Sequence, residues 1–274
     1  MKIIVIFLFI SILINHSFAF AGSDFKLASI RNVQLEYIDI GSGNINIVIE
    51  SGVGMGGKYW QPLLPMLKNL KQRIIIYSRA GNGNSSAVAD VSLKQSNMRL
   101  RALLELLNIR KNIVLVGHSY GGLHVREYAK SNQNQVIGLV LLDPSHEQFE
   151  KNLVELDKSW AEKDNKKLNF ILAESQEWKI LQSVYQKGQL SDNGSITKIP
   201  TVIVTSSKLG ESDWWIGHSE EGKRIWRNLH YSLIRNNPNS VHIISSKTGH
   251  NIPIDAPNLV GKAINQVIEL ANGL

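Results

Sequence analysis

Ser119 stands at the centre of Gly117-His118-Ser119-Tyr120-Gly121, between an apolar strand-like run and a segment of helical character. Side chains at positions 117 and 121 would collide with neighbouring backbone in a turn this sharp, so glycine is needed at both. A strained elbow of this kind presents the serine hydroxyl at a helix N-terminus, where backbone N–H groups favour developing negative charge. The context favours a nucleophilic serine over a glycine turn that contains serine by chance.

A serine hydroxyl is a poor nucleophile unless a base removes its proton, and histidine is the usual base. The chain has eight histidines, so position must choose among them. His250 follows the last predicted strand on a loop at the carboxyl edge of the sheet, where α/β sheets bind their ligands. His118 is the neighbour of Ser119, but the elbow is expected to point it away from the hydroxyl. The sequence therefore predicts His250 as the general base.

An oxyanion formed by attack on a carbonyl needs two backbone N–H donors aimed at one point. One is expected from Tyr120, directly after the nucleophile. The other is expected from the loop 50–57, where four glycines in six residues allow the backbone to approach a substrate closely. Val53 is the first choice in this loop and Gly54 the second. A phosphate-binding loop is the competing interpretation, but no Gly-Lys-Ser/Thr ending follows.

Apolar, β-branched runs alternate with segments of helical period, which predicts an α/β fold with a mostly parallel, eight-stranded sheet flanked by helices. The predicted strands are 25–30, 33–40, 45–50, 74–77, 113–116, 136–142, 200–205 and 241–244. Helices are predicted around Trp60–Leu67 and over 93–107 and 258–271. The polar, helical interval 146–198 is too long for a simple crossover between two strands. It is predicted to be a helical cap inserted after strand six and lying over the active edge of the sheet.

The chain resembles the α/β-hydrolase superfamily in Gly117–Gly122, in Tyr77–Ser85 and in Thr248-Gly249-His250. It also resembles a subgroup whose sixth strand ends in a segment like Leu142–Glu147. The resemblance covers essentially the whole chain after residue 21 and implies the eight-stranded sheet with a cap after strand six. Two positions depart from the family: Ser78 stands where Asp is usual, and Ser51-Gly52 where many members have His-Gly.

The acid that would orient His250 has two candidate positions. Asp143 ends the sixth strand at the active edge, immediately after an apolar run. The more usual family position follows the seventh strand, but Lys208 stands there, and Glu211 and Asp213 come later. Both strand ends can reach the histidine loop, so topology leaves the choice open. Asp143 is preferred to Asp213, against the alternative that Asp143 only caps a turn.

Composition excludes several other kinds of site. The chain has no cysteine, which excludes thiol nucleophiles, disulfides and thiolate metal sites. The formal net charge is +7, but the cations are scattered, and those in 151–167 interleave with acidic residues as on a solvated helical face. The sequence therefore predicts no nucleic-acid partner. No cofactor and no metal are expected, and the oligomeric state is left open.

The first 21 residues have the three-part layout of a secretory signal peptide. Met1-Lys2 is a positive start, 3–14 is almost unbroken apolar sequence, and Ala19-Phe20-Ala21 offers small residues before the cut. A retained anchor is disfavoured because the apolar run is shorter than the roughly 20 residues that span a bilayer. The expectation is a signal peptide over 1–21 and one domain over 22–274, exported to the periplasm or the medium without stable membrane insertion.

These residues predict a carboxylesterase-like serine hydrolase that cleaves a small ester or lactone through an acyl-enzyme. Ser119 would attack the carbonyl, His250 would take its proton, and the N–H groups of Tyr120 and Val53 would hold the oxyanion. Two alternatives stay open. One is carbon–carbon bond hydrolysis or acyl transfer by the same residues, and the other is a non-catalytic binding protein on the same fold.

The predicted cleavage site can be tested on protein recovered from outside the cytoplasm. Its intact mass should correspond to a chain that begins at Gly22. A chain that still begins at Met1 would identify the leader as an anchor.

Overall fold

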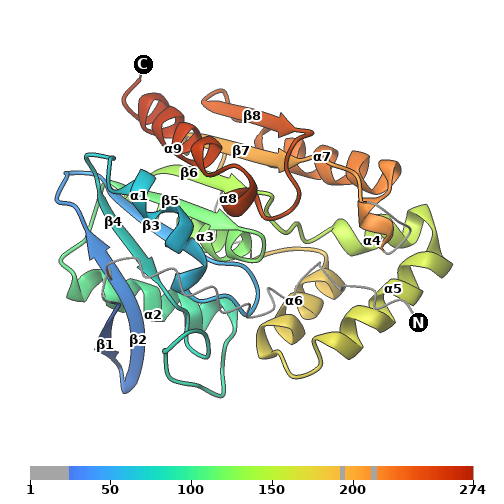
Figure 1. Ribbon diagram of the computed structural model, residues 1–274, viewed down its shortest axis with the longest axis horizontal. Helices are drawn as coiled ribbons and strands as arrows, with labels where there is room; N and C mark the ends of the chain where they lie inside the picture. The colour runs from blue at the N-terminus through green and yellow to red at the C-terminus, as the bar shows by residue number, and fades with distance from the viewer. Residues whose placement is uncertain (1–24, 192–194, 211–214, 274) are drawn as a thin grey trace.

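The computed structural model describes residues 25–191, 195–210 and 215–273, and the predicted signal peptide lies outside them. Within these residues, eight strands form one sheet in the order β1-β2-β4-β3-β5-β6-β7-β8 (Figure 1). The strands are β1 (Lys26–Ile30), β2 (Val33–Ile40), β3 (Asn46–Glu50), β4 (Arg73–Tyr77), β5 (Ile113–His118), β6 (Val136–Leu142), β7 (Thr201–Ser206) and β8 (Ser240–Ser245). The eight-stranded sheet predicted from the sequence is confirmed.

The sheet is mostly parallel because only its first two pairings are antiparallel, β1 with β2 and β2 with β4. The β1–β2 hairpin turns on Arg31 and Asn32, which have φ values of 47° and 68°. A two-residue turn with positive φ at both residues has a backbone twist that matches the right-handed twist of the two strands it connects. All later neighbours are parallel, which brings the carboxyl ends of β5, β6, β7 and β8 to one edge.

Apolar residues alternate between the two faces of the central strands, so both faces are buried. In β3, Val48 belongs to one core cluster, whereas Ile47 and Ile49 belong to the other. The first cluster packs against α2 (Leu93–Leu106) and α3 (Gly121–Ser131), and the second against α9 (Pro257–Ala271). Further helices are α1 (Leu64–Leu67), α7 (Glu220–Ile234) and α8 (Ile252–Asp255). No helix in the described part of the chain is long and apolar enough to cross a membrane.

The helix predicted around Trp60–Leu67 is present, but most of it is a 3₁₀ helix and not an α-helix. A 3₁₀ helix, η1 (Gly57–Leu63), comes first and the short α1 follows it. Proline lacks an N–H, and its ring clashes with the preceding turn of an α-helix. Pro62 lies inside η1 and Pro65 in the first turn of α1, so neither residue can donate the backbone hydrogen bond that a continuous α-helix would need there. The apolar residues of this segment still pack into the core as expected.

Three helices between β6 and β7, here called the cap helices, occupy most of the predicted insertion: α4 (Phe149–Leu156), α5 (Lys158–Ile171) and α6 (Gln176–Lys187). Figure 1 shows them together at one end of the sheet, with α4 next to α7. Leu168 of α5 and Trp178 of α6 belong to the same buried apolar cluster as Tyr120, the residue after the elbow serine. The cap helices therefore bury the region around Ser119.

Candidate active site

Ser119 occupies a sharp turn between β5 and α3, with a φ of 54°. A Cβ at Gly117 would lie 2.6 Å from the Gly121 carbonyl oxygen, and a Cβ at Gly121 would lie 2.6 Å from that of Glu50. Both distances are too short for a real carbon atom, so the elbow requires glycine on either side. Ser119 is only 4% exposed and lines a cavity beneath the cap helices.

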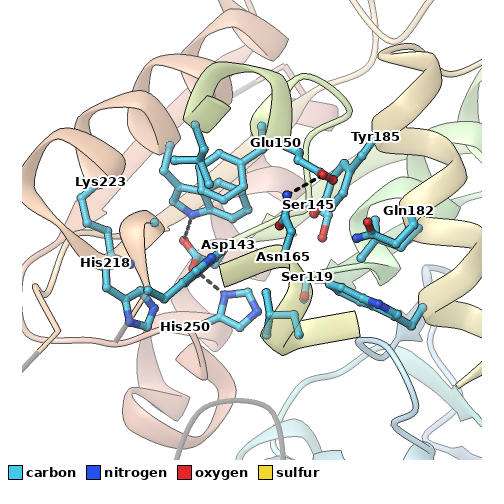
Figure 2. Close-up of a pocket in the computed structure, with 18 residues that line it drawn as sticks. Ser119, Asp143, Ser145, Glu150, Asn165, Gln182, Tyr185, His218, Lys223 and His250 are labelled. Atoms are coloured by element: carbon cyan, nitrogen blue, oxygen red, sulfur yellow. Dashed lines mark hydrogen bonds and ion pairs between the residues drawn. The ribbon is translucent and has the colours of Figure 1, made fainter. Parts of the chain in front are cut away.

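His250 lies on the loop after β8 and lines the same cavity as Ser119 (Figure 2). Its Nδ1 is 2.7 Å from Oδ2 of Asp143. The backbone of His250 is held as well, because its carbonyl oxygen lies 2.8 Å from Nε2 of His118. Burial lowers the pKa of His118 to about 3, so this ring is neutral and Nε2 donates the proton.

Asp143 follows β6 with a φ of 44° and is buried. Besides His250, its carboxylate accepts hydrogen bonds from the Ser206 N–H and Oγ, both at 2.8 Å, and from Trp226 Nε1 at 2.7 Å. Burial alone would raise the pKa of this carboxyl group. The hydrogen bond to His250, its charge and that of Lys223 hold the pKa well below its usual range. The carboxylate therefore stays ionised without a direct ion pair to lysine or arginine.

Of the two candidate positions for the acid, the structure brings Asp143 to His250. Glu211 and Asp213 lie outside the described residues. The catalytic role of Asp143 stays a prediction, but a turn cap alone does not account for its contacts with Ser206, Trp226 and His250.

The glycine-rich loop after β3 lies directly against the elbow. A Cβ at Gly52 would be 3.5 Å from Cβ of Ser119. The N–H of Gly54 donates to Oε2 of Glu177 at 2.8 Å, so it is not available to an oxyanion. Of the two donors considered in this loop, Val53 remains. Tyr120 precedes the first residue of α3, as expected for the other donor.

The cavity beneath the cap helices is narrow, with a volume of about 50 Å³. Apolar and aromatic side chains supply much of its wall, among them Phe149, Leu181 and Trp215. Figure 2 shows a polar group on the cap side, where Glu150 and Asn165 lie beside Tyr185. Asn165 Nδ2 donates to Glu150 Oε1 at 2.7 Å, and burial raises the pKa of Glu150.

Several residues that support the site were missed by sequence reasoning. His118 was expected only to point away from the hydroxyl, and Trp226 and Ser206 were assigned no role. A buried indole N–H nearly always has a hydrogen-bond partner, but the sequence gives no sign that the partner of Trp226 is Asp143, 83 positions away. Ser78, which departs from the family, accepts from Gly57 N–H and donates to Glu36. These two hydrogen bonds connect parts of the core outside the cavity, so Ser78 has a structural role, as expected for this position.

The described residues contain no group of three or more His, Asp or Glu side chains that could hold a metal ion.

The family description "alpha/beta hydrolase fold" matches residues 45–186, slightly more than half of the chain. The chain belongs to the alpha/beta hydrolase family. The sheet order, the elbow and the position of His250 after β8 are consistent with that membership.

A curated relative spans most of this alpha/beta hydrolase. It is "Uncharacterized protein YqjL" of Bacillus subtilis (strain 168), 28% identical over 228 residues, which are 83% of this chain and 85% of that protein. Among solved structures, a thermophilic esterase from Thermogutta terrifontis has a TM-score of 0.61 at 16% identity, covering 90% of this chain and 99% of that one. "Est816 as an N-Acyl homoserine lactone degrading enzyme" has a TM-score of 0.57 at 15% identity, covering 88% and 99%. These structural similarities show the fold alone.

Proposed function

We propose that this alpha/beta hydrolase cleaves carboxylic esters or lactones, with Ser119 as nucleophile, His250 as general base and Asp143 as the orienting acid. The observation that supports the proposal best is the 2.7 Å contact between His250 Nδ1 and Asp143, in a cavity that Ser119 also lines. An ionised carboxylate on Nδ1 keeps the proton on that nitrogen, which assigns the proton-accepting role to Nε2.

The reaction follows from these assignments. Ser119 Oγ forms a bond to the substrate carbonyl carbon while its proton passes to His250 Nε2, and the negative charge develops on the carbonyl oxygen. The N–H groups of Val53 and Tyr120 stabilise this oxyanion. Collapse breaks the bond to the alcohol oxygen, which takes the proton from His250. Water then attacks the acyl-enzyme with His250 again accepting a proton, and Ser119 is restored.

The cavity limits the substrates that this mechanism would act on. Its small volume and apolar walls favour a short apolar group beside the scissile bond. A substrate carboxylate placed beside Glu150 would lie where burial already raises the pKa of a carboxyl group, so its charged form is disfavoured there. We therefore infer substrates that are uncharged at that end. Export after cleavage of residues 1–21 is part of the same proposal, supported by the leader sequence.

The alternatives predict different outcomes with the same reagents. A carbon–carbon hydrolase or an acyltransferase would react with a fluorophosphonate but turn over simple esters poorly. A non-catalytic binding protein would not react, because phosphonylation requires an activated serine.

Ser119→Ala should abolish fluorophosphonate labelling and lower kcat for 4-nitrophenyl acetate by about six orders of magnitude, because the three residues act as one unit. Ser131→Ala is the matched control. It removes an exposed serine at the far end of α3 and should leave both readouts unchanged. Retention of more than a few per cent of activity in Ser119→Ala would show that another residue is the nucleophile.

A further inference from the structure

Arg79, on the loop after β4, is a buried cation whose guanidinium group uses every N–H it has. Nε donates to Glu177 Oε1 at 2.6 Å. Nη1 donates to Glu50 and to the Ser51 carbonyl, and Nη2 to Glu177 and to the Gly52 carbonyl, all at 2.7–2.9 Å. A guanidinium has five N–H donors, so none is left over. Two of the five bonds therefore hold the backbone of the loop that contains Val53.

The bond to Gly52 fixes the direction of the Val53 N–H. The Gly52 carbonyl and the Val53 N–H belong to one peptide unit, which is planar and trans, so they point in opposite directions. Because Arg79 draws the Gly52 oxygen toward itself, the Val53 N–H is turned away from Arg79. Gly52 is also the residue whose added Cβ would contact Ser119. A flip of this peptide would present a carbonyl oxygen where an oxyanion needs a donor.

Glu177 belongs to α6, one of the cap helices, whereas all its partners belong to the core. Its carboxylate accepts four hydrogen bonds: two from Arg79, one from Asn82 at 2.8 Å, and one from the N–H of Gly54 at 2.8 Å. The side chain is 6% exposed. Glu177 thus holds the residue after Val53 directly and the residue before it through Arg79.

We propose that Glu177 is a positioning residue, through which the cap helices hold the oxyanion loop in its active geometry. This rests on the proposed function, because it assigns the Val53 N–H to the oxyanion. The cap helices then have a second role besides covering the substrate, because Glu177 of α6 is needed to hold the Val53 N–H in position.

The inference predicts a specific kinetic defect in Glu177→Gln. A glutamine has one acceptor oxygen for four donors, and its NH₂ group would face other N–H groups. Loss of one oxyanion donor costs about 100- to 1,000-fold in kcat, and a displaced donor costs less. We expect kcat per active serine to fall about 10- to 100-fold, with KM nearly unchanged since the cavity walls stay in place. The variant should fold, because Arg79 keeps Glu50 as its charge partner.

Glu174→Gln is the matched control, since it removes an exposed carboxylate three positions earlier in the chain. The number of active serines is measured by fluorophosphonate labelling carried to completion, and turnover is divided by this number. Partial unfolding then lowers the number of labelled serines but leaves kcat per labelled serine unchanged. Affinity for a trifluoromethyl ketone, which forms an oxyanion with serine, is compared with affinity for the matching methyl ketone. Glu177→Gln should show a smaller preference for the trifluoromethyl ketone than the wild-type protein, and Glu174→Gln should keep the wild-type preference.

Two results would overturn the role of Glu177. One is a kcat per labelled serine within about twofold of the wild-type value, and the other is an unchanged ratio of the two ketone affinities. Neither result would affect the proposed hydrolase activity, which fails if the wild-type protein shows no ester or lactone turnover.

Discussion

The buried carboxylate of Asp143 is the group on which the rest of the site depends. A buried charge is costly unless hydrogen bonds surround it, and here Ser206, Trp226 and His250 supply them. The donors come from β7, from α7 and from the loop after β8, so three elements must converge on the end of β6. Parallel strands make this possible because their carboxyl ends meet at one edge.

A second constraint joins the cap helices to the core. Glu177 and Arg79 form a buried ion pair across the two, and such a pair is tolerated only when its remaining donors and acceptors are satisfied. Here they are satisfied by the backbone of the loop that faces Ser119. The same interactions that dock α6 therefore also orient peptide groups next to the nucleophile.

The sequence predicted the sheet and the elbow well because these depend on local patterns. Apolar, β-branched runs define the strands, and the elbow at Ser119 needs glycine two positions away on either side. The contacts that complete the site are between residues far apart in the chain. Glu177 is 98 positions from Arg79, and nothing in the sequence around the start of α6 distinguishes it from Glu174, an exposed residue just before the helix. The proline-interrupted η1 was missed because its apolar spacing also suits an α-helix.

The role of Asp143 is tested most directly by comparing Asp143→Asn with Asp213→Asn, each checked for folding by circular dichroism and thermal melting. Removing an acid that fixes the tautomer of the histidine lowers kcat by a factor of about 10⁴ at neutral pH. We predict a loss of this order in Asp143→Asn, with fluorophosphonate labelling slowed by a similar factor, and near-normal turnover in Asp213→Asn. A large loss in Asp213→Asn with near-normal activity in Asp143→Asn would show that Asp143 is not the orienting acid.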